Sequence, residues 1–214
     1  MATAAATERP LVLIVDDDDA VRGALQELIL SVGLDVAGFA SANELLKAEL
    51  PDRSGCLVLD VRMPGSSGLD LQQHLASTGR AKPVIFLTGH GDIPMSVQAM
   101  KAGAVDFLTK PFRDQTLLDA ITAGIERDIS QRAEARTVRM HVDHYGTLTP
   151  RERQVLAAVA VGRLNKQIAF DLGISEVTVK LHRSSVMKKM QAGSVAELIR
   201  AWEALPAGLR ENRT

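Results

Sequence analysis

Four short segments in the first half of the chain each lead into a charged or hydroxyl residue, and this placement constrains the possible fold strongly. An acidic residue at the carboxyl end of a buried strand lies where open α/β sheets place their chemistry. Asp60 is the most informative of these residues, because it ends a compact apolar run and is followed by Met63, Pro64 and Gly65. The four segments are Leu11–Val15 before Asp16 and Asp17, Cys56–Leu59 before Asp60, Val84–Leu87 before Thr88, and Asp106–Thr109 before Lys110.

Predicted strands and helices alternate over this half of the chain. Apolar residues at helical spacing predict a helix over 19–32 that Gly33 ends, and Ser41 with Glu44 forms the capping-box pattern of the next helix. Five strands that alternate with five helices predict a flavodoxin-like α/β fold, a parallel sheet of strand order 2-1-3-4-5 with helices on both faces. The expected strands are 11–15, 35–39, 56–60, 83–88 and 105–109, and the later helices are 67–77, 93–102 and one from about 113.

Three carboxylates, one hydroxyl and one ammonium group are therefore expected to meet at one edge of this sheet. Carboxylates crowded together repel one another, so a cation is needed to hold them. Mg²⁺ suits this role, because it binds oxygen ligands and keeps several waters. The residues predict a divalent cation site that can handle a phosphoryl group.

The second half of the chain has a different pattern. Residues 127–146 are charged and poor in large apolar groups, and we expect a linker there that is helical at first and loose by 144–146. Four helices should follow. Thr149, Pro150 and Glu152 give a strong start to the first. The four expected ranges are 150–161, 165–172, 176–190 and 195–205.

Charge and composition separate the two halves further. Residues 1–126 hold ten basic and seventeen acidic residues, a net charge of −7, whereas residues 127–214 hold fifteen and nine, a net charge of +6. The basic half is a candidate nucleic-acid binder. Cys56 is the single cysteine and is expected to be a buried apolar residue, which suits a reducing cytoplasm. The sequence contains neither a membrane-spanning run nor a secretory signal pattern, so we expect a cytoplasmic protein.

The motifs around Asp16-Asp17, Asp60, Thr88-Gly89 and Lys110-Pro111 resemble those of a receiver domain of a two-component response regulator, and the helical tail resembles the helix-turn-helix domain of the NarL/LuxR class. The pairing is similar to the FixJ type. This resemblance implies a phosphoacceptor receiver over 10–126, a linker over 127–146 and a small all-α, four-helix DNA-binding domain over 147–208.

The resemblance also implies roles for the site residues. Asp60 would accept a phosphoryl group from a sensor histidine kinase, and Lys110, joined to Pro111 by a cis bond, would pair with the new phosphate. Mg²⁺ would be held by Asp16, Asp17, Asp60 and the backbone carbonyl of Arg62. Thr88 would bind the phosphoryl oxygens and Phe107 would be the switch aromatic. The phosphorylated receiver would form a homodimer through residues within 92–102 and 106–121.

In the tail, the spacing of Ala169, Gly173 and Val179 fits a helix-turn-helix. Helical geometry predicts an inward seam of Val179, Val186 and Met190, and an outward face directed at promoter double-stranded DNA. On that face, Lys180, Leu181 and Ser184 are expected at base edges. The residues expected at phosphates are Lys166, Thr178, Arg183, Lys188 and Lys189.

Three other interpretations fit parts of the sequence. A haloacid-dehalogenase-like phosphatase would use Asp16 as nucleophile and Asp18 as acid, although Asp19 stands where that fold has Thr or Val and Asp60 is left unexplained. The chain could also be a constitutive DNA binder with an inactive receiver. The basic tail alone could instead be a protein-binding helical bundle.

Overall fold

The computed structural model describes residues 9–64, 66–89 and 93–211, and it divides into two compact units at Arg132 and Ala133. Each unit is described by itself. The N-terminal lead-in before Arg9, Gly65 of the Asp60 motif and Asp92 of the expected dimer surface lie outside the described residues. Within the described part, no helix is long and apolar enough to cross a membrane.

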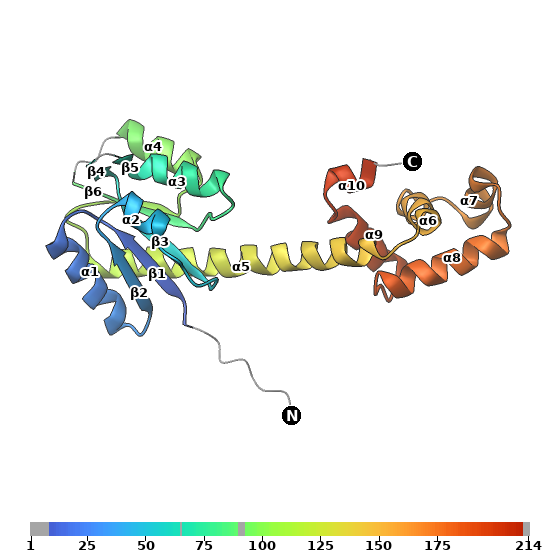
Figure 1. Ribbon diagram of the computed structural model, residues 1–214, viewed down its shortest axis with the longest axis horizontal. Coiled ribbons are helices and arrows are strands. Elements are labelled where there is room, and N and C mark those ends of the chain that lie inside the picture. Colours follow the sequence, from blue (N-terminus) through green and yellow to red (C-terminus); the bar gives the residue numbers. More distant parts are fainter. Residues whose placement is uncertain (1–8, 65, 90–92, 212–214) are drawn as a thin grey trace, which may run out of the picture. The chain divides into compact units, whose positions relative to one another are not determined.

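The N-terminal unit is built on a five-stranded parallel sheet (Figure 1). Its strand order is β2-β1-β3-β6-β7, which is the predicted order 2-1-3-4-5 when the five strands are counted along the chain. A two-stranded antiparallel hairpin, β4 and β5, follows β3 and was not predicted. The strands are β1 Leu11–Val15, β2 Asp35–Phe39, β3 Gly55–Asp60, β4 Arg62–Met63, β5 Ser66–Ser67, β6 Val84–Thr88 and β7 Asp106–Thr109.

Helices cover both faces of this sheet, as predicted (Figure 1). Alternate residues of β1 point to opposite faces: Leu13 packs with α2, α3 and α4, whereas Ile14 packs with α1 and α5. Two apolar layers therefore enclose the strands, which explains why β1 is an unbroken apolar run. The helices of this unit are α1 Asp19–Ser31, α2 Ala42–Lys47, α3 Gly68–Ser77, α4 Ile93–Lys101 and the first part of α5 Asp114–Gly146.

Helix α5 corrects one expectation. It is a continuous helix of 33 residues through Gly146, so the prediction of loose chain at 144–146 is wrong. Tyr145 is buried in the apolar core of the C-terminal unit, and its hydroxyl donates a hydrogen bond to the carbonyl oxygen of Leu209 at 3.2 Å. Leu209, 64 positions away, thus orders the end of α5, although the local composition of that segment favours a linker.

A buried ionic cluster secures α5 to the amino end of the sheet. The Asp128 carboxylate is 4% exposed and accepts hydrogen bonds from the Gly55 amide at 2.9 Å and from Nε of Arg132 at 2.8 Å. Nζ of Lys82 lies 3.7 Å from the same oxygen. Leu117, Ile121 and Ile125 form the apolar stripe of α5, and Asp128 follows where this stripe ends. Because these donors satisfy its carboxylate, a charged residue can be buried there.

The C-terminal unit is helical and has one apolar core. The predicted inward seam is confirmed, because Val179, Val186 and Met190 are buried in that core. Gly173 has φ of 64° and ends α7 in the left-handed region, which allows the tight turn before α8. Helix α10 lies beyond the last predicted helix. The helices are α6 Pro150–Ala160, α7 Asn165–Leu172, α8 Glu176–Lys189, α9 Val195–Glu203 and α10 Ala207–Glu211.

Gly55 should be the least replaceable glycine of the sheet. A Cβ there would lie 1.8 Å from the carbonyl oxygen of Leu11, whereas a Cβ on Gly23 of α1 would meet nothing within 4 Å. We predict that Gly55→Ala lowers the free energy of unfolding of the N-terminal unit by about 2 kcal/mol or more. Gly23→Ala should raise it by roughly 0.5–1 kcal/mol.

Urea unfolding followed by far-ultraviolet circular dichroism measures both variants. The single tryptophan, Trp202, lies in the C-terminal unit, so its fluorescence separates the transition of that unit. A Gly55→Ala variant as stable as the wild type would contradict the close pairing of Gly55 with Leu11 between β3 and β1.

Candidate functional site

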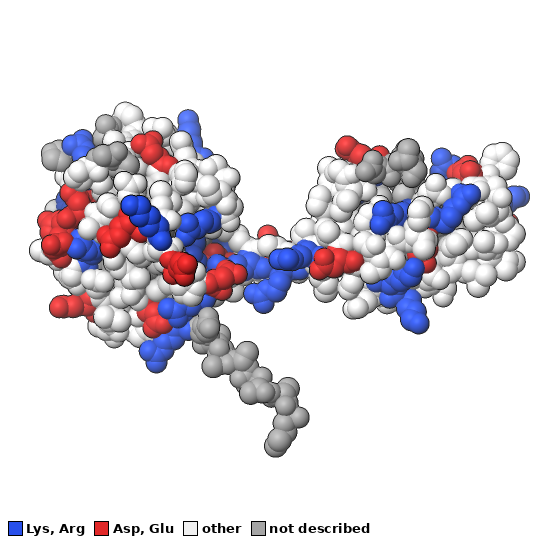
Figure 2. Space-filling view, viewed as in Figure 1, with Lys and Arg blue, Asp and Glu red and all other residues white. Residues whose placement is uncertain are grey.

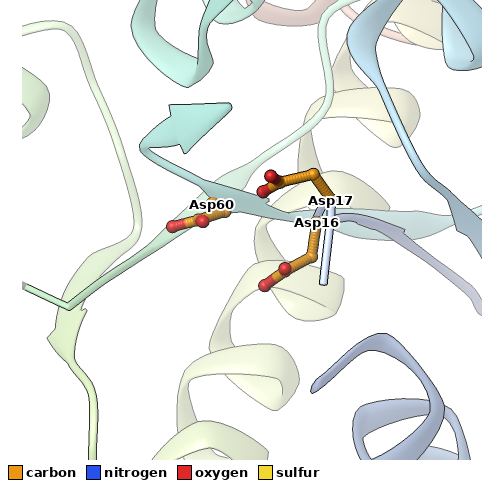
Figure 3. Close-up of side chains that lie close together, drawn as sticks. All are labelled: Asp16, Asp17 and Asp60. Carbon is orange, nitrogen blue, oxygen red and sulfur yellow. The ribbon is translucent and has the colours of Figure 1, made fainter. Parts of the chain in front are cut away.

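The predicted acidic residues meet at one edge of the sheet. One carboxylate oxygen each of Asp16, Asp17 and Asp60 lie within 4.8 Å of one another (Figure 3). β1 and β3 are parallel neighbours that pair Val15 with Leu59, so the residues that follow Val15 come to lie beside the end of β3. The sequence reasoning therefore identified the members of this cluster and the topology that assembles them.

Lys110 reaches the cluster from the end of β7. Its Nζ lies 2.7 Å from Oδ2 of Asp16 and 3.8 Å from Oδ2 of Asp60. The backbone amide of Lys110 donates to the carbonyl oxygen of Thr88 at 2.7 Å, which ties the end of β7 to that of β6. The peptide bond between Lys110 and Pro111 is cis, as the resemblance implied.

The three carboxylates differ in their surroundings. Asp16 is fully buried, and besides Lys110 its side chain accepts the backbone N–H of Asp18 at 3.0 Å. Nη1 of Arg22 donates to the carbonyl oxygen of Asp16 at 2.8 Å, a contact that sequence reasoning missed. Asp17 is exposed, and Asp60 is partly exposed. The two carboxylates open to solvent are therefore Asp17 and Asp60.

The electrostatics of Asp60 favour its neutral form. Burial raises the pKa of this carboxyl above its usual range; Lys110 opposes that rise, Asp16 adds to it, and backbone hydrogen bonds from Arg62 and Val61 lower it again. The net effect is a raised pKa. A cation beside Asp60 would lower the pKa of this carboxyl again, because an opposite charge favours the ionised carboxylate.

The donor set fits Mg²⁺. It consists of carboxylate oxygens, one of them exposed, which leaves room for the waters that Mg²⁺ retains. The carbonyl of Arg62 belongs to β4, two residues after Asp60. The described residues thus offer an acidic cluster that could hold a metal ion.

Thr88 and Phe107 occupy different environments beside this cluster. Thr88 ends β6 and is 1% exposed, so its hydroxyl lies inside the edge of the sheet. Phe107 is half-buried, packs against the core on the side of α2, α3 and α4, and its ring lies 6.3 Å from that of Phe86 in a tilted arrangement. Cys56 is buried on the other face, and burial raises the pKa of its thiol to about 12, which leaves it no nucleophilic role.

The outward face of α8 presents a mixed basic and apolar surface. Lys180, Ser184 and Lys188 are exposed, and Leu181 is 65% exposed. Val177, which sequence reasoning missed, is 67% exposed near the start of the same helix. Figure 2 shows Lys and Arg side chains over the C-terminal unit, including near the C-terminal end of α8. Large apolar groups beside lysines on one exposed helix suit contact with thymine methyl groups between phosphates.

Several expected phosphate contacts have structural partners. Nη1 of Arg183 donates to Oδ1 of Asn165 at 2.9 Å, and the Thr178 hydroxyl hydrogen-bonds the Ser175 hydroxyl at 2.8 Å. Lys166 is exposed at the start of α7.

Lys189, another residue expected at a phosphate, also has a structural partner. Its Nζ lies 2.7 Å from the carboxylate of Glu152, which is buried. Burial would raise the pKa of Glu152, but hydrogen bonds from Lys189 and Thr149 outweigh it and hold that pKa below its usual range. Lys189 therefore neutralises a buried carboxylate that also closes the capping box of α6.

Comparison with known proteins gives the same two parts. The model of the response regulator receiver domain matches residues 12–122, and that of the luxR family of bacterial regulatory proteins matches residues 146–202. Nodulation protein W of Bradyrhizobium diazoefficiens is 53% identical over 98% of this chain and 91% of its own length. FixJ of Azorhizobium caulinodans is 46% identical over 92% of each chain. The solved structure of the response regulator StyR is 47% identical, covers 91% of this chain and 98% of StyR, and has a TM-score of 0.79.

A receiver with an acidic cluster, joined to a helix-turn-helix, defines a DNA-binding response regulator, and this chain belongs to that family, among relatives such as FixJ. The family regulates transcription within two-component systems and is not a class of enzymes. The phosphatase interpretation is therefore wrong. Asp18, its proposed acid, instead caps α1 by accepting the backbone N–H groups of Ala20 and Val21.

The raised pKa of Asp60 predicts how stability depends on its charge. The stabilising contribution of a group with a raised folded pKa is complete below its ordinary pKa of 3.8 and is lost as pH rises through the folded value. At neutral pH without Mg²⁺, Asp60→Asn should therefore stabilise the N-terminal unit, on the order of 1 kcal/mol. The gain should shrink as pH falls toward 4 and when Mg²⁺ is added.

Asp18→Asn is the matched control, because it removes an equal charge nearby and asparagine can still cap α1. Thermal unfolding at several pH values, with and without Mg²⁺, measures both variants. An Asp60→Asn variant that is less stable than the wild type at neutral pH without Mg²⁺ would show that the surroundings of Asp60 do not disfavour its ionised carboxylate.

Proposed function

We propose that Asp60 accepts a phosphoryl group from the phosphohistidine of a sensor kinase. A carboxylate oxygen of Asp60 forms the new P–O bond as the P–N bond to histidine breaks, which gives an acyl phosphate. The observation that carries this proposal is the 4.8 Å cluster of Asp16, Asp17 and Asp60 with Lys110 beside it.

Mg²⁺ and Lys110 have distinct parts in this proposal. Asp17, Asp60 and the Arg62 carbonyl would hold the ion, with Asp16 acting through water, and its positive charge would offset the negative charge of the incoming group. Lys110 is within 3.8 Å of Asp60 and needs only a small movement to pair with a phosphate there. Asp16, whose carboxylate holds the Lys110 ammonium, positions it.

The proposed switch connects this chemistry to assembly. Thr88 would hydrogen-bond the phosphoryl oxygens, and Phe107 would move inward against the space that this opens. Phe107 is half-buried at the core. It belongs to β7, the strand that pairs with β6 of Thr88, and this proximity supports such coupling. The surface of α4, β7 and α5 would then form the contact of a homodimer.

In the C-terminal unit, we propose that α8 is the recognition helix, which would enter the DNA major groove. Lys180, Leu181 and Ser184 would face base edges, and Lys166, Thr178, Arg183 and Lys188 would face phosphates. The exposed basic and apolar face of α8 supports this assignment. A dimer would read two half-sites.

Phosphorylation should control dimerisation and DNA binding together. Full-length protein treated with acetyl phosphate and Mg²⁺ should elute as a dimer in size-exclusion chromatography. It should bind a duplex selected from a random-sequence pool at least about tenfold more tightly than untreated protein, because a dimer engages two half-sites at once. Asp60→Asn, treated identically, should show neither change. Equal DNA affinity of treated and untreated wild type would favour the constitutive DNA binder.

Leu181 and Lys188 should contribute to DNA binding in different ways. Leu181→Ala should lower affinity for the selected duplex by about 1 kcal/mol and leave binding to unrelated DNA nearly unchanged, because it removes an apolar base contact. Lys188→Gln should weaken binding to both and reduce the slope of log affinity against log salt by about 1. Fluorescence anisotropy over a salt series measures both.

Lys47→Gln, an exposed lysine of α2 in the N-terminal unit, is the matched control for loss of one positive charge. If Leu181→Ala weakens binding to every sequence equally, Leu181 does not read bases.

A further inference from the structure

A cavity of about 500 Å³ lies in the C-terminal unit, and none of the predicted DNA contacts lines it. Its walls include Tyr145 and Trp202, the only tyrosine and tryptophan of the chain, whose ring centroids are 6.2 Å apart. Ala157, Leu172 and Leu209 contribute apolar surface. This volume lies within the range of sites that bind small organic molecules.

Three arginines also line the cavity, and two of them have no carboxylate partner among the residues that the structure describes. Arg163 pairs with Asp171 at 3.8 Å. Arg153 stacks over the Tyr145 ring at 4.9 Å and donates one long hydrogen bond, 3.4 Å, to a backbone carbonyl. Among the described residues, Arg153 and Arg210 form no ion pair, and Nε of each has no hydrogen-bond partner. Two guanidinium charges therefore stand at one cavity without neutralisation by that part of the chain.

We propose that this cavity binds a small organic anion, a carboxylate attached to an apolar ring or chain. Guanidinium groups match carboxylates in charge and in the geometry of their paired donors. The aromatic and aliphatic walls match the apolar remainder of such a molecule. A purely inorganic anion would leave the apolar surface unused, and a neutral hydrocarbon would leave the guanidinium charges uncompensated.

The position of the cavity gives its occupant a structural effect. Tyr145 belongs to the end of α5, Trp202 to α9 and Arg210 to α10. One bound molecule would contact all three segments, so it would stabilise the C-terminal unit against unfolding. None of the predicted DNA contacts lines the cavity, so the anion and DNA would not compete for side chains.

Trp202 supplies a direct reporter, because it is the only tryptophan of the full-length protein and lines the cavity. Titration with cyclohexanecarboxylate should change its fluorescence in a saturable way with a midpoint below about 1 mM, a modest affinity for a ligand of this size. Cyclohexylmethanol, which has the same ring and no charge, should bind at least about tenfold more weakly.

Three variants make the test specific. Arg210→Gln should raise the midpoint for the carboxylate at least about tenfold and leave that of the alcohol unchanged. Arg200→Gln is the matched control, because this exposed arginine lies on α9 outside the cavity and removes the same charge; its midpoint should stay within about twofold of the wild type. Arg153→Gln repeats the test of Arg210→Gln at the side of the cavity that Tyr145 lines.

The proposal is overturned if fluorescence shows no saturable response to the carboxylate, or if carboxylate and alcohol bind equally. Equal loss of binding in Arg210→Gln and Arg200→Gln would also overturn it, because the effect would then be one of net charge. A response to a glutamate-rich peptide but not to cyclohexanecarboxylate would replace the small-molecule site with a protein-docking surface.

Discussion

Repulsion among closely spaced carboxylates is the constraint on which the N-terminal unit depends. Parallel β1 and β3 bring one carboxylate oxygen each of Asp16, Asp17 and Asp60 within 4.8 Å of one another, and among the described residues only Lys110 forms ion pairs with them. Burial raises the pKa of Asp60, the proposed phosphoacceptor, and Lys110, which is closer to the buried Asp16, offsets this rise only in part. Three carboxylates beside one ammonium group leave an excess of negative charge, which a bound divalent cation would balance.

Much of this arrangement could be predicted from local sequence, for physical reasons. Strands that end in Asp, Thr and Lys predict a shared sheet edge because parallel strands must align their carboxyl ends. Capping also depends on neighbouring residues, and Ser41 and Thr149 cap α2 and α6 as their patterns indicate. The inward seam of α8 followed from helical periodicity alone. The same periodicity placed Leu181 on the outer face.

The contacts that could not be predicted all involve partners distant along the chain. Tyr145 is ordered by Leu209, and Lys189 pairs with Glu152, 37 positions earlier. Asp128 carries its charge into the core only because Gly55 and Lys82 meet it there. A single sequence gives no signal for such pairs, since each residue taken alone has the composition of a surface or linker position. The cavity beside Trp202 has the same origin, because five segments of the unit contribute its walls.

The most direct test of the proposed chemistry is the intact mass of the protein after treatment with acetyl phosphate, with and without Mg²⁺, for the wild type and Asp60→Asn. The acidic cluster predicts one phosphoryl adduct on the wild type that requires Mg²⁺, and none on Asp60→Asn. An adduct that forms equally without Mg²⁺, or one that persists in Asp60→Asn, would contradict the assignment of Asp60 as the metal-assisted phosphoacceptor.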